Sequence, residues 1–207
     1  MQPTTETPTP PRTVITTSRN PTQSTRTFTN DLASALPNAL RITRGKSSLT
    51  TLAEKALEQE AEKIIIVDRW KGGSGRIQLY ALNESGLQQH YPLIYLKNVK
   101  LRRELGYTRS GKTKTLAIQT DPKTTPEAEK LADALAQFLD IPRLPTQQTQ
   151  TTIHIALNPY CRIQITFPRT PQKTEIGPRI TISHLVWKQK DEKKRDDTPR
   201  TSLGKTS

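Results

Sequence analysis

The chain has 207 residues, in which 32 Lys and Arg residues outnumber 19 Asp and Glu residues and give a formal net charge of +13. A protein this basic usually binds a polyanion, and no apolar run approaches the about 20 residues that a membrane-spanning helix needs. Cys161 is the only cysteine, which excludes an internal disulfide and leaves no recognisable zinc spacing. We therefore expect a protein of the reducing cytoplasm that binds no membrane, metal or other cofactor.

The two ends of the chain differ in composition from the rest. Residues 1–11 contain almost nothing to bury, and residues 188–207 are charged and polar. Both ends are predicted to be disordered tails because they lack apolar residues for a core. The stretch between them, residues 12–187, is long enough for one domain with a substantial core or for two small domains packed together.

Strands and helices alternate in the first part of this stretch. In chain order we expect a strand at 12–17, a helix that Ser24 caps and Pro37 ends, a strand at 39–43, a helix capped by Ser47 or Ser48, a buried central strand at 63–68, a glycine loop at 72–75, and paired strands at 76–82 and 88–96. The apolar faces of the two helices are Phe28, Leu32, Ala35 and Leu36, and then Leu49, Leu52, Ala53, Ala56 and Leu57. Pro92 lacks a backbone N–H, which favours an edge strand or a bulge.

The second part begins with a basic segment. Residues 97–114 have few apolar residues and seven cations against one acid, which is typical of a connector. After it we expect a strand at 115–120, a helix with Thr125 as N-cap and Pro126 in its first turn, an antiparallel hairpin of 153–157 with 161–167, and a strand at 179–186.

The two parts resemble each other. In each of them, a Thr-rich strand leads into a Pro-containing turn, a helix with Leu-Ala spacing and a proline stop. This similarity indicates a duplication, although the second part lacks an obvious second helix. We predict a mixed α/β (α+β) fold of two similar halves, about 12–98 and 113–187, each a small mixed sheet with packed helices.

Residues 106–113 (GYTRSGKT) match the P-loop pattern GxxxxGK[ST] letter for letter. A phosphate-binding P-loop needs a buried strand before the loop and a helix after it. Here the preceding residues are highly charged, and the following ones favour a strand. We therefore predict no nucleotide site at this segment, and a P-loop NTPase remains an alternative.

Polar residues of another kind stand where strands end. Arg44, Lys46 and Ser47 lie where a strand leads into a helix N-terminus, whose free amides and dipole favour an anion. They are equally compatible with a helix cap and solvated charges.

Asp68 and Asp121 follow apolar strands, where metal-binding carboxylates of α/β enzymes lie. Loop caps are commoner at such positions, and a metal-dependent nuclease remains the second enzymatic alternative.

Three stretches together resemble a known family. They are residues 16–21 (TTSRNP), residues 44–46 (RGK) with the helix that follows, and residues 175–179 (EIGPR). In this order and spacing they are similar to the signature stretches of the Brix domain. The resemblance covers residues 12–187, and the lack of long extensions makes the chain most similar to compact archaeal members.

The resemblance implies two halves that are each like the anticodon-binding domain of class IIa tRNA synthetases. It also implies a ribosome biogenesis factor without catalytic residues, which binds pre-rRNA or a guide-type small RNA and works with ribosome assembly proteins. Arg19, Arg44, Lys46 and Arg179 lie in the matching motifs, and Gly177 and Pro178 are expected to fix how the chain enters the last strand, through positive φ at Gly and fixed φ at Pro.

Further RNA-binding candidates rest on charge alone. These basic residues are Lys97, Lys100, Arg102, Arg103, Arg109 and Lys112. Aromatic residues make up only 5% of the chain, so we expect recognition of RNA shape and backbone rather than extensive stacking on bases. An adaptor protein whose charge only keeps it soluble is the remaining alternative.

Overall fold

The computed structural model describes residues 12–70, 73–84, 86–107, 113, 115–143, 151–169 and 174–188. Its first part consists of β1 (Arg12–Thr17), α1 (Gln23–Ala35), β2 (Ala39–Arg41), α2 (Leu49–Leu57), β3 (Ala61–Trp70), β4 (Gly73–Asn83) and β5 (Gly86–Lys100). Its second part consists of the 3-10 helix η1 (Arg102–Leu105), β6 (Ala117–Thr120), α3 (Pro126–Leu139), β7 (Thr152–Leu157), β8 (Ile163–Thr166), β9 (Pro168–Arg169), β10 (Thr174–Glu175) and β11 (Arg179–Val186). Arg109, Lys112 and the predicted tails, apart from Lys188, lie outside the described residues.

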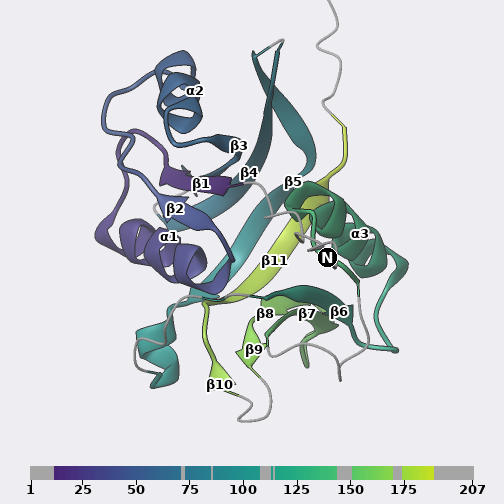
Figure 1. Cartoon of the computed structure of the whole chain (residues 1–207). Helices are drawn as coiled ribbons and strands as arrows, with labels where there is room; N and C mark the ends of the chain where they lie inside the picture. The colour runs from purple at the N-terminus through teal and green to yellow at the C-terminus, as the bar shows by residue number, and fades with distance from the viewer. Residues whose placement is uncertain are drawn as a thin grey trace, which may run out of the picture.

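A single curled sheet joins both parts of the chain (Figure 1). Its nine strands follow the order β2-β1-β3-β4-β5-β11-β8-β7-β6. β1 pairs in parallel with β2 and β3, β6 pairs in parallel with β7, and the remaining neighbours are antiparallel. This arrangement confirms the predicted mixed α/β class. In the described part of the chain, no helix is long and apolar enough to cross a membrane.

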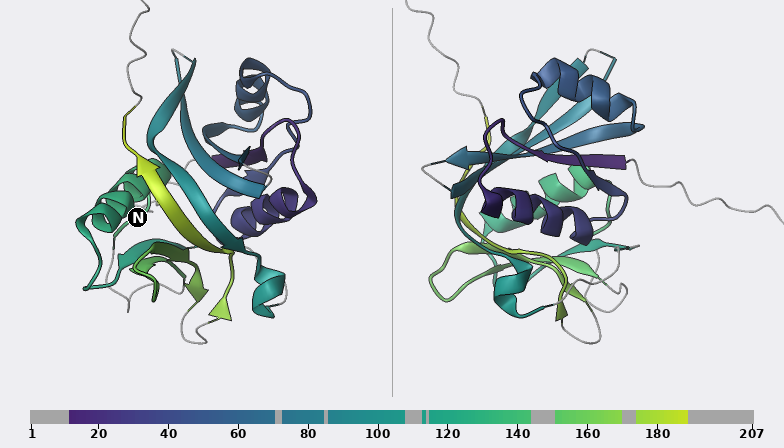
Figure 2. Two further views of the ribbon diagram at one scale, coloured as in Figure 1. Left: turned by 180° about the vertical axis from the view of Figure 1, so that it is seen from behind. Right: turned by 90° about the vertical axis from the view of Figure 1, so that its left-hand side faces the viewer.

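The two faces of the sheet bury different helices because successive strand side chains point to opposite faces. On the inner face of the curl, Ile65 of β3 belongs to a core with Phe28 of α1 and Leu131 of α3. On the outer face, Ile64 belongs to a second core with Leu52 of α2. Figure 2 shows α1 and α3 between the two ends of the curled sheet, with α2 outside it. β3 is therefore buried on both faces, as its apolar run predicts.

The helix caps are mostly local features that the sequence specifies. Ser48 accepts a hydrogen bond from the Thr51 amide at 3.0 Å, and Thr125 caps α3 in the same way. The cap of α1 is Thr22 rather than Ser24. Thr22 precedes the helix and Ser24 lies in its first turn, and the two side chains hydrogen-bond each other at 2.8 Å. The sequence therefore allowed either residue to act as the cap.

The predicted apolar face of α2 is only partly buried. Leu52 and Ala56 are fully buried, whereas Leu49 and Leu57 are 39% and 62% exposed. A nine-residue helix that touches the sheet along one line buries two successive turns. The leucines at its ends therefore remain in contact with solvent.

Of the two features predicted at Pro92, the structure shows the bulge and not the edge strand. β5 lies inside the sheet between β4 and β11, so Pro92 does not mark an edge strand. It does lie at a bulge, because the pairing with β4 shifts between Ile77 and Leu79, opposite this residue. β4 also begins at Gly73, so the predicted glycine loop is shorter than expected.

The predicted connector begins too early, because β5 continues through Lys97 to Lys100. Lys100 pairs with Arg179 of β11, a strand from the end of the folded chain. The backbone of this charged stretch is thus held in the sheet while the Lys97 and Lys100 side chains remain exposed. Local composition did not reveal this distant pairing.

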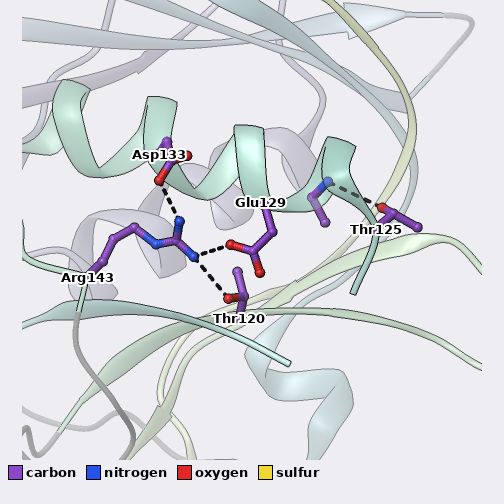
Figure 3. A network of polar contacts seen from close by, with 6 residues as sticks. Thr120, Thr125, Glu129, Asp133 and Arg143 are labelled. Carbon is purple, nitrogen blue, oxygen red and sulfur yellow. Dashed lines mark hydrogen bonds and ion pairs between the residues drawn. The ribbon is translucent and has the colours of Figure 1, made fainter. Parts of the chain in front are cut away.

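Strand pairing in the second part follows that in the first. β3 has β1 as its parallel neighbour and β4 as its antiparallel one, and β7 likewise lies between β6 and β8. Arg143 forms a parallel bridge with Ile118 of β6, on the side where β2 flanks β1. The Arg143 side chain hydrogen-bonds Glu129 and Asp133 of α3, which holds this segment beside β6 (Figure 3).

Candidate nucleic-acid interface

Two strand-to-helix loops carry cations at one edge of the sheet. Arg19 lies between β1 and α1, and Arg44 and Lys46 lie between β2 and α2. Because β1 and β2 are parallel, both loops leave the same edge, and the N-termini of α1 and α2 begin there. We call these three cations with Ser47 the helix-entrance cluster. Free amides and the positive ends of two helix dipoles add to their charge.

Contacts within the cluster orient its side chains. The Arg44 Nε donates to the Ser47 carbonyl oxygen at 3.2 Å, and the Lys55 Nζ donates to the Ser47 hydroxyl at 3.3 Å. Burial, followed by repulsion from Arg19, lowers the pKa of the Arg44 guanidinium below its usual range, although the group remains charged at neutral pH. The Thr16 hydroxyl donates to the Ile42 carbonyl oxygen at 2.9 Å, so the TTSRNP stretch lies beside the loop that carries RGK.

No carboxylate neutralises this cluster by direct contact within the described residues. The ion pairs recorded there include none that involves Arg19, Arg44 or Lys46. Arg19 and Lys46 are exposed, and Arg44 is half-buried. A phosphate group at this edge would relieve the repulsion and use the oriented amides.

The second group of predicted cations lies around the end of β5. Lys97, Lys100 and Arg103 are exposed. Arg179, opposite Lys100, forms an ion pair with Glu175, which raises the pKa of the arginine above its usual range. Three free cations and one paired cation therefore lie together here, while the side chains of Arg109 and Lys112 lie outside the described residues.

Arg102 differs from its neighbours. Its guanidinium lies 3.5 Å from the Asp31 carboxylate, and its backbone amide donates to the same carboxylate at 3.0 Å. The side chains of Arg102 and Asp31 are only 12% and 6% exposed. This pair fastens η1 to α1 and leaves little of the Arg102 guanidinium for a ligand.

The two cationic regions lie toward opposite ends of α1. Arg19 precedes the first turn of this helix. The second group, Lys97, Lys100 and Arg103, which we call the β5–η1 region, is connected to the other end of the helix through the hydrogen bond between Arg102 and Asp31. Near the same end, the Thr113 hydroxyl donates to the Ser34 carbonyl oxygen at 3.3 Å. Between Gln23 and Asp31 a helix rises about 12 Å. The two groups of predicted cations thus lie toward different ends of this helix.

The structural context of the P-loop pattern is not met by the described residues. Gly106 ends η1 with a φ of 77°, and the first element after Thr113 is the strand β6. α3 begins only at Pro126. The helix that would present amides to a phosphate after the GKT sequence is therefore replaced by a strand, as the sequence predicts.

The two aspartates of the nuclease alternative have structural partners. Asp68 forms an ion pair with Arg76, and the Asp121 carboxylate accepts from the Lys123 amide at 2.9 Å. The described residues contain no cluster of three or more His, Cys, Asp or Glu side chains suited to a metal ion. Both residues therefore serve the strand pairing and the turn in which they lie.

The sequence did not reveal a row of polar side chains on the outer face of the sheet. Asp68, Arg76, Tyr95 and His184 lie opposite one another on β3, β4, β5 and β11. The Tyr95 and His184 rings are stacked, with centroids 4.3 Å apart and an interplanar angle of 11°. Only the pairing of β5 with the distant β11 brings these rings together.

Comparison with known proteins identifies relatives of this chain. A probable Brix domain-containing ribosomal biogenesis protein from Methanopyrus kandleri is 33% identical over 131 residues, which cover 63% of this chain and 68% of the relative. The chain belongs to this Brix domain family. No family model matches the sequence.

Other Brix domain relatives match a shorter region. Proteins of the same name from Pyrococcus horikoshii and Thermococcus kodakarensis are 35% and 34% identical over 94 residues, or 45% of this chain. The chain spans 42% and 45% of the length of these two relatives in the matched region.

Two solved structures share the fold of this chain over most of its length. The crystal structure of a probable ribosomal biogenesis protein from Aeropyrum pernix aligns with a TM-score of 0.73 at 24% identity, covering 85% of this chain and 99% of the other. Mil, an archaeal Imp4-like protein, aligns with a TM-score of 0.60 at 18% identity, covering 86% and 100% of the two chains. At these identities the likeness concerns the fold alone.

Proposed function

We propose that this Brix domain protein is a non-catalytic ribosome biogenesis factor of the cytoplasm, which binds pre-rRNA or a guide-type small RNA and works with ribosome assembly proteins. The observation that carries the proposal is the helix-entrance cluster, in which cations without carboxylate partners among the described residues meet two helix N-termini. Family membership supports the cellular process, and the charge supports RNA as the ligand.

Binding at the helix-entrance cluster would be directed at phosphates. Arg44 is held by Ser47 and repelled by Arg19, so its charge is preorganised and gains from an anion. Lys46 is exposed and adds a second positive charge on a flexible side chain. Contacts of this kind fix the position of the RNA backbone and carry little sequence information.

The β5–η1 region would supply a second, separate backbone contact through Lys97, Lys100 and Arg103. We assign Arg102 and Arg179 supporting roles there, because Asp31 and Glu175 pair with them. Arg109 and Lys112 remain predicted contacts. Two contacts at opposite ends of α1 favour an RNA that is extended or folded over this helix.

The two parts of the chain would be products of one duplication. In support, β2-β1-β3-β4-β5 corresponds to the Arg143 segment followed by β6-β7-β8-β11, with the same parallel and antiparallel pairings. The two units would then join through their last strands, β5 and β11. The similarity of each unit to the anticodon-binding domain of class IIa tRNA synthetases is part of this proposal.

A titration of structured and scrambled RNA at several salt concentrations tests the proposal. Each lost phosphate contact lowers the slope of log affinity against log salt by about 0.7 to 0.9, so Arg44→Ala/Lys46→Ala is expected to lower it by about 1.4 to 1.8. The matched control is Lys123→Ala/Arg162→Ala, which removes two exposed charges from the second part of the chain. This control should keep the wild-type slope.

Two outcomes would favour the alternatives. If Arg44→Ala/Lys46→Ala binds RNA with wild-type affinity and slope, the helix-entrance cluster is not the RNA site. If the wild-type protein binds no RNA, an adaptor is favoured. ATP and GTP are expected to leave the melting temperature unchanged. Nucleotide turnover that disappears in a folded Lys112→Ala variant would instead support the NTPase.

A further inference from the structure

Four side chains form a ladder across the outer face of the sheet. Asp68 is paired in register with Arg76, Arg76 with Tyr95, and Tyr95 with His184. Opposed residues on neighbouring strands project from the same face. The Arg76 guanidinium binds Asp68 and lies 5.9 Å from the centre of the Tyr95 ring, which in turn stacks on the imidazole of His184.

The ladder lies on a part of the sheet that the described helices leave uncovered. α2 packs on the same face over Ile64 and Ile66, toward the other end of β3. α1 and α3 lie on the opposite, inner face. The ladder therefore lies on the outer face of the sheet next to α2, where no described helix packs on it.

The ring stack ends at the exposed imidazole of His184. β8 pairs with β11 at Ile180 and Thr181 only, so none of the described strands lies beside His184 on the side away from Tyr95. His184 is exposed, and its Nδ1 lies 3.3 Å from the Ser183 hydroxyl. The exposed imidazole is thus the end of the stack to which a further flat ring could be added.

The other end of the ladder reaches the helix-entrance cluster. The Ser18 amide donates to the Val67 carbonyl oxygen at 3.0 Å, which places the loop with Arg19 beside Asp68. Burial lowers the pKa of Arg76, but hydrogen bonds with Asp68 and Tyr95 outweigh it and hold the pKa above its usual range. The ladder thus holds the Arg76–Asp68 ion pair between the cluster and the stacked rings.

We infer that the Tyr95–His184 pair is a stacking platform for an unpaired RNA base, whose chain runs from the helix-entrance cluster across the outer face of the sheet. The inference rests on the proposed RNA binding and adds the class of RNA that this face accepts. Three strand spacings separate Asp68 from His184, or about 14 Å. A few nucleotides of single strand cover this distance, and the neighbouring cations favour a nucleic acid over an apolar peptide.

Fluorescence anisotropy with a labelled single-stranded RNA of about ten nucleotides tests the inference. The same RNA with abasic sites and a duplex RNA are the comparison ligands. His184→Ala is expected to weaken binding of the single strand on the order of 5- to 100-fold, with an unchanged salt slope because no phosphate contact is lost. His184→Phe should retain most of the affinity, since a flat ring remains.

Tyr160→Ala is the control, because it removes a ring that is 83% exposed and does not belong to the ladder. It should bind like the wild type, and the abasic RNA should bind His184→Ala and wild type alike. If His184→Phe loses as much affinity as His184→Ala, or if neither changes binding, the stacking inference is wrong while RNA binding stands. A wild-type protein that binds none of the RNAs would overturn the proposed function itself.

Discussion

A methyl group at Gly177 should destabilise the fold through overpacking. A Cβ built on Gly177 would lie 2.7 Å from a ring carbon of Phe167 and 2.8 Å from the Cβ of Ala35. Ordinary contact begins at 3.4 Å, so these neighbours would have to retreat by several tenths of an ångström. Phe167 and Ala35 are both buried, and Ala35 belongs to α1. We therefore expect Gly177→Ala to lower the free energy of unfolding by roughly 1–3 kcal/mol.

This mechanism differs from the positive φ that the sequence suggests. Gly177 does not adopt positive φ, whereas Gly45 does, at 58°, with open space around its Cα. Asn tolerates the left-handed conformation better than Ala does, so Gly45→Asn should be more stable than Gly45→Ala. At Gly177 the order should reverse, because Asn is larger than Ala.

Urea unfolding monitored by circular dichroism measures both pairs of variants. The midpoint should fall for Gly177→Ala while the slope with urea stays constant. RNA affinity, measured well below the unfolding transition, should stay at the wild-type value. A Gly177→Ala variant as stable as the wild type, or one that binds RNA more weakly at unchanged stability, would refute the packing argument.

Two further predictions concern ion pairs. Asp31→Ala leaves the Arg102 guanidinium buried without its partner, which should cost about 3–5 kcal/mol in urea unfolding, and Asp31→Ala/Arg102→Met should recover part of this loss. The hydrogen bond from Arg143, followed by that of Thr120, lowers the pKa of Glu129 in the folded protein. The contact therefore contributes its full stabilisation above the unfolded pKa of about 4.3. This stabilisation disappears as the pH falls through the lower folded pKa. Arg143→Met should therefore flatten the loss of stability below about pH 4.3, and an unchanged acid transition would contradict the assignment.

Features set by neighbours in sequence were predictable. The buried run of β3 and the caps at Ser48 and Thr125 depend on residues within one or two turns. The extension of β5 to Lys100 depends instead on β11, which is far away in the chain. Propensity and composition describe a segment by itself, so a charged strand that gains its stability from a distant partner reads as a loop.

The same limit applies to the candidate site. The sequence identified Arg19, Arg44 and Lys46 through contiguous motifs, and the structure brings these motifs to one edge. It also assigned Arg102 to RNA by charge, although Asp31 occupies this arginine. Partners across the fold thus decide whether a cation is available, and sequence composition counts all cations alike.

This distinction determines how the surplus of positive charge acts. Asp68, Asp31 and Glu175 hold Arg76, Arg102 and Arg179 in place, and each of these pairs joins two elements or closes a turn. Among the predicted RNA-binding cations, those without such partners in the described ion pairs are Arg19, Arg44 and Lys46 in the strand-to-helix loops and Lys97, Lys100 and Arg103 around the end of β5. Removing an arginine of the first kind should lower stability and leave the salt dependence of RNA binding nearly intact, because its charge is already compensated. Removing one of the second kind should lower the salt dependence and leave stability nearly intact, because no partner loses its counter-charge.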